Sequence, residues 1–318
     1  IALVLAFSFG LYGLAKKKAK APAMPGLTVE TGLLVLPALL WLGFVEAKGQ
    51  GTFGHATAAT NTLLVVAGPC VVESAGQCLE VAARLRELCA ERGLPYVFKA
   101  SYRKANRSSG RSFAGLGAEE ALGVLARVGR EVGVPVLTDV HEAAEVPAAA
   151  AVADALQIPA FLCRQTALLE AAARSGRAVN VKKGQFLAPA DMRHAVEKLR
   201  AAGGERILLT ERGTSFGYGD LVVDMRGLVV MRELGWPVLF DATHSLQRPG
   251  GAETGGERRL AFPLMRAAVA CGVDGLFFEC HPDPARARSD AATQLPLDQA
   301  SAFLDEAVRA RAAAGPGR

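Results

Sequence analysis

The sequence predicts a closed (β/α)8 barrel, or TIM barrel, preceded by an N-terminal apolar extension. From Leu63 onward, eight short apolar runs alternate with amphipathic stretches. This alternation predicts parallel strands joined by right-handed helical crossovers, and eight repeats in roughly 250 residues match the size of a closed barrel. An open doubly wound sheet is the alternative, but no Gly-x-Gly-x-x-Gly follows the first run.

The expected strands are short, and nearly all of them end in polar residues. In chain order they are residues 63–68, 96–101, 134–140, 155–161, 178–184, 206–212, 237–243 and 275–281. The segments between them, such as residues 78–93, carry apolar residues at three- and four-residue spacing, which is typical of amphipathic helices. We therefore expect residues 61–318 to form a single barrel domain.

Residues 1–60 do not fit this pattern. Their two apolar runs, residues 1–14 and 33–45, are each shorter than the roughly 20 residues of a membrane-spanning helix. Lysines follow the first run instead of preceding it, which is unlike a signal peptide and similar to a membrane helix that ends in a cytoplasmic loop. The segment resembles a fragment of a drug/metabolite transporter, and an over-long gene model or a recombined junction is the alternative. We expect the barrel to need neither this segment nor a membrane.

Composition excludes several classes of protein. The 318-residue chain is 51% hydrophobic, which argues against disorder. Its formal net charge of +5 is spread along the chain without a basic stripe interleaved with aromatics, so nucleic acid is not an expected partner and small anions are. The six cysteines form no C-x-x-C pair, which favours a reducing cytoplasm over a disulfide scaffold.

The carboxyl ends of parallel barrel strands meet at one mouth, which is where barrel enzymes hold their active sites. The polar residues expected there are Lys99, Ser101, Asp139, His141, Gln157, Arg164, Lys182, Arg212, Asp241, His244 and Glu279. A purely structural barrel does not need so many ionisable groups around one mouth. The pattern therefore predicts a catalytic rim.

Five cations are expected at this mouth. Lys99 and Lys182 lie on strands, Arg212 ends a strand, and Lys104 and Arg107 follow one. A buried cation is costly unless it meets a negative partner. Without equal numbers of acids, converging cations favour an anionic ligand; the alternative is that each pairs with a nearby Asp or Glu.

Four residues form a possible metal site. Cys70, His244 and Glu279 end strands 63–68, 237–243 and 275–281, which are neighbours in a closed eight-stranded barrel, and Asp290 follows the last strand. One thiolate, one imidazole and two carboxylates suit Zn²⁺, Fe²⁺ or Mn²⁺. The alternative is that Cys70 is a buried small hydrophobe.

Nine segments in chain order resemble the 3-deoxy-D-manno-octulosonate 8-phosphate synthase family, over about residues 62–310. They are AGPCVVES, VFKASYRKANRSS, LTDVHE, QIPAFLCRQT, NVKKGQF, TERGTSFGYGDLVVDMR, FDATHS, FFECHPDP and SDAATQLPL. The resemblance implies condensation of phosphoenolpyruvate with D-arabinose 5-phosphate and water, giving 3-deoxy-D-manno-octulosonate 8-phosphate and phosphate for lipopolysaccharide precursor biosynthesis. It also implies a cytoplasmic homotetramer.

The resemblance also implies roles for individual residues. Phosphoenolpyruvate is expected on Lys99, Lys104, Lys182 and Arg212, and arabinose 5-phosphate on Asn106, Arg107, Ser108 and an Arg164 from a neighbouring subunit. Members with Cys at the Gly-Pro-Cys position need a divalent metal, so Cys70 implies the metal-dependent branch. In all, we expect Lys99, Lys104, Lys182, His244 and Asp241 to act in catalysis, and Ser101, Asn106, Arg107, Ser108, Gln157, Arg164, Arg212, Asp139 and His141 to bind substrate.

The chain departs from the family at Arg103, where the family usually carries an acid. Two other activities stay open. The 3-deoxy-D-arabino-heptulosonate 7-phosphate synthases resemble the chain in fold and phosphoenolpyruvate site, but they typically carry KPRTS where this chain has KANRSS. A Schiff-base aldolase, with Lys99 or Lys182 as the nucleophilic amine, is the other alternative.

Overall fold

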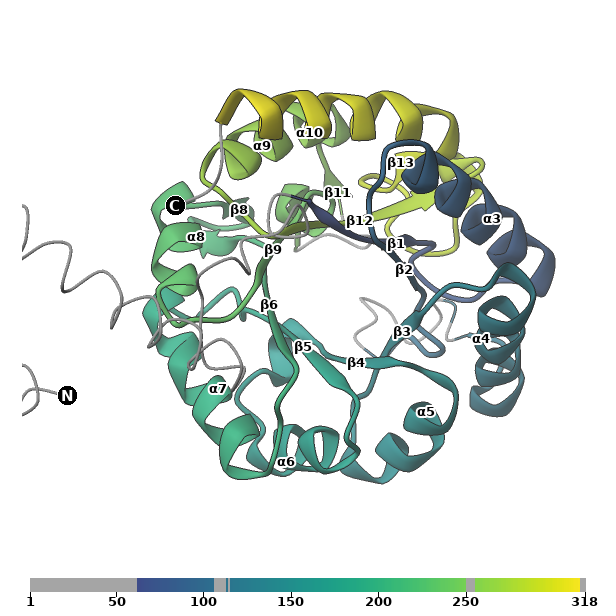
Figure 1. Ribbon diagram of the computed structural model, residues 1–318, viewed down its shortest axis with the longest axis vertical. Helices are drawn as coiled ribbons and strands as arrows, with labels where there is room; N and C mark the ends of the chain where they lie inside the picture. The colour runs from purple at the N-terminus through teal and green to yellow at the C-terminus, as the bar shows by residue number, and fades with distance from the viewer. Residues whose placement is uncertain (1–61, 106–112, 114, 250–254, 315–318) are drawn as a thin grey trace, which may run out of the picture. The chain divides into compact units, whose positions relative to one another are not determined.

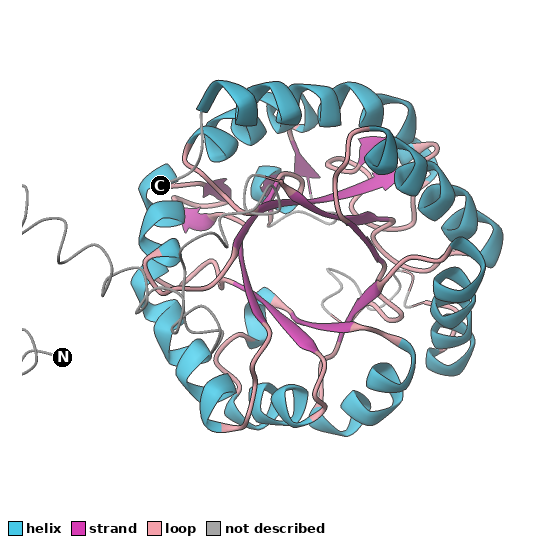
Figure 2. Ribbon diagram, viewed as in Figure 1, coloured by secondary structure: helices cyan, strands magenta, loops and turns pink. Residues whose placement is uncertain are grey.

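The computed structural model describes residues 62–105, 113, 115–249 and 255–314. In this part of the chain, eight parallel strands form a closed ring surrounded by helices (Figures 1 and 2). In ring order they are β1 (Leu64–Gly68), β2 (Tyr96–Lys99), β3 (Val136–Asp139), β4 (Ala155–Ile158), β5 (Ala178–Lys182), β6 (Ile207–Glu211), β9 (Val238–Asp241) and β12 (Gly275–His281). Pairing of Leu64 with Gly275 and of Gly68 with Glu279 closes the ring between β1 and β12.

The helices lie on the outside of this ring (Figure 2). They are α3 (Ala75–Glu91), α4 (Ala118–Val132), α5 (Val146–Val152), α6 (Thr166–Arg174), α7 (Met192–Ala201), α8 (Met225–Arg232), α9 (Ala261–Ala270) and α10 (Ala300–Ala314). Local signals set their ends. The Ser74 hydroxyl accepts from the amide of Gln77 at the start of α3, and Gly133 ends α4 in the left-handed conformation that glycine adopts without a steric penalty.

Short two-stranded sheets follow the carboxyl ends of some barrel strands. The hairpin β7 (Thr214–Phe216) and β8 (Asp220–Val222) follows β6, and β10 (Gln247–Arg248) pairs with β11 (Gly255–Gly256) after β9. After β12, β13 (Leu295–Pro296) adds to the sheet beside Cys280 and His281. These additions bring loop residues over the barrel mouth.

Two apolar regions hold the fold together. The larger lies between strands and helices, where residues such as Leu85, Leu125 and Phe303 are fully buried. The smaller lies inside the barrel and contains Val66, Leu137, Ala155, Leu239 and Phe277. Burial of this surface supplies most of the favourable free energy of folding, at roughly 25 cal/mol per Å² of apolar area.

The predicted barrel is confirmed in strand number, order and closure, but most predicted strand bounds are too long. Only 275–281 keeps its expected length, whereas 96–101 ends at Lys99 and 155–161 ends at Ile158. Beyond those points the regular ladders end, although Ser101 keeps one isolated bridge to Val71, and the chain continues into loops. An apolar sequence pattern can therefore continue where regular strand pairing stops. The expected extension, residues 1–60, lies outside the described residues. Within the described ranges, no helix is long and apolar enough to cross a membrane.

Candidate active site

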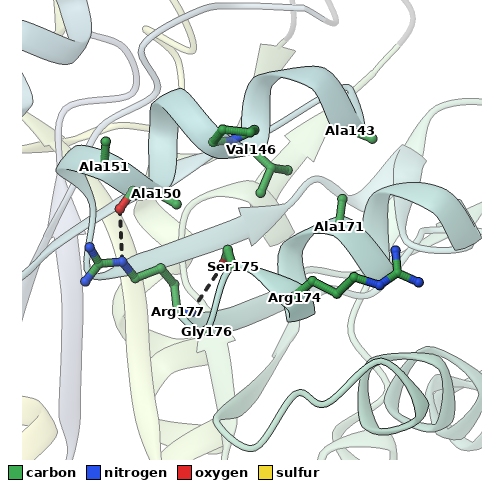
Figure 3. Close-up of a pocket in the computed structure, with 10 residues that line it drawn as sticks. Ala143, Val146, Ala150, Ala151, Ala171, Arg174, Ser175, Gly176 and Arg177 are labelled. Atoms are coloured by element: carbon green, nitrogen blue, oxygen red, sulfur yellow. Dashed lines mark hydrogen bonds between the residues drawn. The ribbon is translucent and has the colours of Figure 1, made fainter.

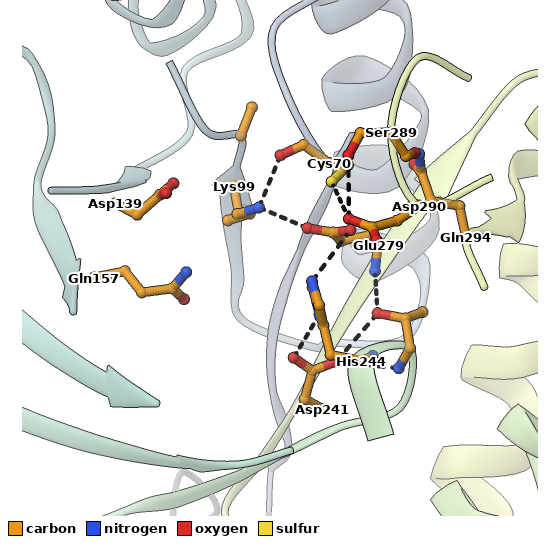
Figure 4. A network of polar contacts seen from close by, with 12 residues as sticks. Cys70, Lys99, Asp139, Gln157, Asp241, His244, Glu279, Ser289, Asp290 and Gln294 are labelled. Carbon is orange, nitrogen blue, oxygen red and sulfur yellow. Dashed lines mark hydrogen bonds and ion pairs between the residues drawn. The ribbon is translucent and has the colours of Figure 1, made fainter. Parts of the chain in front are cut away.

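The carboxyl ends of β1 and β12 and the segment after β12 bring three possible metal ligands together, and β9 places His244 beside them. A sulfur of Cys70 and carboxylate oxygens of Glu279 and Asp290 all lie within 4.8 Å of one another. His244 borders this group, with Nε2 3.6 Å from Glu279 Oε2, and Figure 4 shows the four side chains turned toward one another. The predicted neighbourhood of these strands is therefore confirmed.

Cys70 lies at a bend of the chain, two residues after the end of β1. A Cβ on Gly68 would lie 2.2 Å from the carbonyl oxygen of Lys99, so only glycine lets β1 pass β2 this closely before the chain turns to Cys70. The Cys70 thiol donates to Asp290 Oδ2 at 2.9 Å. Burial, together with the nearby charges of Asp290 and Glu279, raises the pKa of this thiol well above its usual value. This hydrogen bond argues against the alternative that Cys70 is only a small buried hydrophobic residue.

Asp290 is held in an uncommon backbone conformation. Its φ of 49° makes it the one non-glycine residue with positive φ in the described part of the chain, a conformation that costs roughly 1–2 kcal/mol for most residues. Its Oδ2 accepts from Cys70 and from Lys104 at 2.9 Å, while its Oδ1 accepts from Gln247 at 2.8 Å. Strain of this kind is typical of functional sites, where surrounding contacts determine the geometry.

The imidazole of His244 is oriented by Asp241. Asp241 Oδ2 lies 2.8 Å from Nδ1, and Asp241 Oδ1 accepts from the backbone amides of Thr243 and His244. Burial alone would raise the pKa of Asp241, but the charges of His244 and Lys182 outweigh burial and hold that pKa well below its usual range. A carboxylate on one ring nitrogen leaves the other nitrogen facing the cluster, as in metal-binding histidines.

Three lysines of the rim each meet an acid. Lys99 Nζ lies 2.7 Å from Glu279 Oε1, Lys104 Nζ lies 2.9 Å from Asp290 Oδ2, and Lys182 Nζ contacts Asp241. For these three lysines the structure shows the alternative that the sequence left open, which is pairing with a nearby acid. Asp241 ends β9 just before His244, whereas Glu279 lies on β12 and Asp290 follows it. Glu279 and Asp290 are 180 and 186 positions from their lysines, so motifs taken one by one did not show that these cations and carboxylates converge.

Burial affects these lysines differently. It lowers the pKa of Lys182, because the nearby Asp241 does not fully offset desolvation and Lys99 adds repulsion. For Lys99 and Lys104, burial also acts to lower the pKa, but the charges of Glu279 and Asp290 outweigh it, so both values are raised. The Lys182 ammonium also lies 3.6 Å from the centroid of the Phe277 ring, which forms a cation–π contact at the floor of the mouth.

Arg212 is buried without a carboxylate partner in the described part of the chain. Its Nη2 donates to Gln247 Oε1 at 2.6 Å, while its Nη1 is buried and has no hydrogen-bond partner among the described residues. Burial lowers the pKa of this guanidinium. A buried donor without a partner is costly, so this nitrogen is placed to bind an anionic ligand.

The next part of the rim is built on β3. His141 Nε2 lies 3.0 Å from Asp139 Oδ2, and its Nδ1 lies 3.3 Å from Glu145. Burial acts to lower the pKa of His141, but the hydrogen bond and charge of Asp139 outweigh it and raise the value. Arg103 extends this network, with Nη2 2.5 Å from Glu145 Oε1, so the unusual arginine is neutralised by acids near the mouth.

Neutral polar groups continue the rim inside the barrel. Asn180 Nδ2 donates to Gln157 Oε1 at 3.0 Å, and the Thr210 hydroxyl donates to Asn180 Oδ1 at 2.7 Å. Ser101 is buried just past β2. In Figure 4, Gln157 and Asp139 lie on the opposite side of Lys99 from the cysteine cluster, so these groups belong to the same mouth.

Four predicted substrate residues do not join this cluster in the described chain. Asn106, Arg107 and Ser108 lie outside the described residues. Arg164 is exposed, and its described polar contact is a backbone one, from Lys198 Nζ to the Arg164 carbonyl at 3.1 Å.

Sequence reasoning did not single out Gln247 or Phe277. Gln247 bonds to both Arg212 and Asp290, and the Phe277 ring lies under Lys182. Their letters carry no chemical signal of their own. The sequence could have indicated them only by position, because Gln247 lies three residues after His244 and Phe277 lies two residues before Glu279.

A surface groove lies away from the mouth, between α5 and α6 (Figure 3). Its cations are already engaged. Arg177 Nε donates to the Ala150 carbonyl at 2.9 Å, and Arg174 pairs with Glu170 at 2.8 Å. The residues that line it include none of the rim groups described above, so the mouth is the stronger candidate.

A closed barrel with lysines, an arginine and four metal-type ligands at its strand ends defines a (β/α)8-barrel enzyme. Comparison with known proteins narrows the class, because the DAHP synthetase I family matches residues 49–312. The chain belongs to this family.

Several curated relatives carry the name 2-dehydro-3-deoxyphosphooctonate aldolase. The protein of Syntrophotalea carbinolica is 56% identical over 257 residues, covering 80% of this chain and 91% of the relative. The proteins of Aromatoleum aromaticum and an Azoarcus species are 54% and 53% identical, covering 79% and 81% of this chain and 91% and 96% of the relatives.

Proposed function

We propose that this enzyme condenses phosphoenolpyruvate with D-arabinose 5-phosphate and water to give 3-deoxy-D-manno-octulosonate 8-phosphate and phosphate. The observation that supports it most is the identity of 56% to a relative named as an octonate aldolase, over 91% of that relative. The family description alone leaves the heptulosonate reaction as the alternative. The KANRSS segment, residues 104–109, favours the octulosonate reaction.

The mouth suits two anionic substrates. Phosphoenolpyruvate carries a phosphate and a carboxylate, and Lys99, Lys104, Lys182 and Arg212 surround the space where β1, β2, β5 and β6 end. Fixed cations in a buried pocket offset the repulsion between the anionic groups and hold the reacting carbons close together. The free Nη1 of Arg212 is the donor best placed for an oxygen of phosphoenolpyruvate.

Bond formation joins C3 of phosphoenolpyruvate to the aldehyde carbon of arabinose 5-phosphate. The aldehyde oxygen gains negative charge as this bond forms, and it takes up a proton to become a hydroxyl. Water adds at C2, and the phosphate leaves with cleavage of its bond to that carbon. The ammonium of Lys182 contacts Asp241 and the imidazole of His244 at the mouth, and these groups are our candidates for holding protons near the reacting atoms.

A divalent cation such as Zn²⁺, Fe²⁺ or Mn²⁺ fits the cluster of Cys70, His244, Glu279 and Asp290. One sulfur, one imidazole nitrogen and two carboxylates are the donors that such cations prefer, and a carboxylate already fixes the second nitrogen of the imidazole. When bound there, the cation would supply Lewis-acid polarisation of the aldehyde oxygen. Glu279 and Asp290 also form ion pairs with Lys99 and Lys104, so the groups proposed for the metal contact the groups proposed for phosphoenolpyruvate.

The exposed aromatic side chains near the mouth support a homo-oligomer, with a tetramer as the expected state. Phe161 and Phe186 follow β4 and β5, and their side chains are 55% and 56% exposed. Arg164, three residues after Phe161 in the chain, is also exposed. A second copy that covers these rings would remove apolar surface from water and bring an arginine to the neighbouring mouth.

We also propose that the barrel acts without residues 1–60, in the cytoplasm. β1 begins at Leu64, and all six cysteines are free, as a reducing compartment would leave them. A chain that starts at Thr60 should express as an active enzyme, with kcat/KM within about twofold of the full chain. Loss of activity in a chain that folds with the same circular dichroism would contradict this.

The acceptor assay tests the proposed activity. Phosphate release is measured with phosphoenolpyruvate and either arabinose 5-phosphate or erythrose 4-phosphate, and kcat/KM should favour arabinose 5-phosphate by about 100-fold or more, because a polar site rejects substrates that leave its groups unpaired. Equal or reversed preference would assign the heptulosonate reaction instead. Borohydride trapping should give no covalent adduct, and an adduct would indicate a Schiff-base aldolase.

A further inference from the structure

Gln247 joins the two halves of the mouth. It is the first residue of β10, three residues after His244, and its side chain is buried. Its Oε1 accepts from Arg212 Nη2 at 2.6 Å, and its Nε2 donates to Asp290 Oδ1 at 2.8 Å. One amide therefore spans from the guanidinium proposed for phosphoenolpyruvate to a carboxylate proposed for the metal.

The chemistry of the two partners fixes the direction of this amide. A guanidinium only donates and an ionised carboxylate only accepts, so the carbonyl oxygen must face Arg212 and the amino group must face Asp290. Glutamate in this position would accept from Arg212 but, when ionised, could not donate to Asp290. Methionine of similar length would do neither.

Gln247 contacts only one side of each partner, and the other side faces the site. Arg212 Nη2 is occupied by Gln247 while its buried Nη1 has no partner in the described part of the chain. Asp290 Oδ1 is occupied by Gln247, while Oδ2 faces Cys70 and Lys104. Gln247 therefore restrains the rotation of both side chains without occupying the atoms that face the site.

We propose that Gln247 is a positioning residue that orients Arg212 for phosphoenolpyruvate and Asp290 for the metal at the same time. The proposal rests on the proposed function, since both ligands come from it. It adds that the two binding sites share one buried amide, so a single substitution weakens both. A residue that only supports the fold would not produce that pair of effects.

Gln247→Met tests the proposal through two equilibrium measurements that need no turnover. The dissociation constant for Zn²⁺ is measured by competition with a chromophoric chelator, and it should rise about tenfold or more, as it does when hydrogen-bonding partners of metal ligands are removed. The dissociation constant for phosphoenolpyruvate is measured on metal-free protein by calorimetry, and it should rise about tenfold, because a hydrogen bond to a charged group is lost. Using metal-free protein keeps the second result independent of the first.

Gln77→Met is the matched control. Gln77 lies in α3, and its amide atoms are also buried, with no hydrogen-bond partner in the described part of the chain. Both dissociation constants of this variant should equal those of the wild type. Thermal unfolding of each variant shows whether it is folded at the assay temperature.

Gln247→Asn covers the case in which Gln247→Met fails to fold. Gln247→Asn keeps the amide, but its side chain is one methylene shorter and cannot reach both partners, so at least one dissociation constant should rise. Gln247→Glu should likewise fail to give wild-type values for both constants. Unchanged constants for a folded variant, or a rise in only one of the two constants of Gln247→Met, would overturn the proposal. A wild type that binds both ligands but makes no octulosonate product would refute the proposed function and leave the Gln247 comparison readable.

Discussion

The interior of the barrel and its mouth are built by the same strands but follow opposite rules. On β3, Leu137 lies in the apolar interior, and Asp139 lies two residues further on at the mouth. On β12, Phe277 and Glu279 show the same step. Since residues two apart on a strand share a face, one step of about 6.6 Å along the strand separates apolar packing from buried charge.

This difference separates stability from chemistry within one sheet. Interior residues stabilise the fold by removing apolar surface from water. Buried charges at the mouth cost free energy unless they are paired, and there Lys99 meets Glu279 while Lys182 meets Asp241. Arg212 departs from this pairing, because its guanidinium is buried against a neutral glutamine amide. At the mouth, burial of Arg212 therefore costs free energy of folding, and binding of an anionic ligand would offset that cost.

The largest expected effect comes from Arg212→Met. It removes a buried cation whose Nη1 has no partner within the described chain, so kcat/KM for phosphoenolpyruvate should fall about 100- to 1,000-fold, as for other electrostatic groups aimed at a reacting anion. The free energy of unfolding should stay the same or rise, because methionine needs no hydration. Steady-state kinetics and urea unfolding measure the two effects. A large loss of stability with normal kinetics would break the comparison.

Leu137→Ala should behave in the opposite way. Leu137 is fully buried inside the barrel, so truncation should lower the free energy of unfolding by about 2–5 kcal/mol. At a temperature where the variant is folded, KM for both substrates should stay within about twofold of the wild-type value, because this side chain lies one step below the charged groups. A change in KM as large as that of Arg212→Met would show that the interior and the mouth are not separate.

The smallest expected effect is a pH dependence of stability carried by His141. Its pKa in the folded chain is raised above 6.5 by the hydrogen bond and charge of Asp139, although burial opposes the shift, and Glu145, Arg103 and Tyr102 are its other polar neighbours. A raised pKa stabilises the fold fully below the unfolded value and ceases to do so as pH rises through the folded value. Wild type should therefore lose more thermal stability than His141→Gln between about pH 6 and about pH 9. Parallel melting curves across this range would contradict the shift.

Much of the fold was predictable because buried barrel strands appear in the sequence as short apolar runs. Runs such as 178–182 are apolar apart from two buried polar residues, Asn180 and Lys182, and the alternation with helices repeats eight times. Strand ends were less predictable. Phe161 continues the apolar pattern after β4 has ended, and Ser101 keeps a single bridge to Val71 beyond the end of β2. The sequence alone does not record where a hydrogen-bonded ladder ends.

The site was predictable where a side chain carries its own chemistry. Cys70, His244 and Glu279 were found because they stand at the ends of adjacent strands. The pairing of Lys104 with Asp290 was not predicted, because these residues are 186 positions apart and meet through loop geometry. Gln247 was missed for the same reason, since an amide gains its role only from the two charges beside it.

Metal content of Cys70→Ser tests the central claim, that this mouth is a metal-dependent synthase site. Elemental analysis of purified wild type should give about one divalent metal per chain, and EDTA should remove both metal and activity until metal is restored. Cys70→Ser should lose most of the metal and the activity, because a neutral hydroxyl poorly replaces a thiolate ligand. Cys89→Ser, at a buried site in α3, should keep both. A Cys70→Ser protein with full metal occupancy and normal turnover would contradict the account.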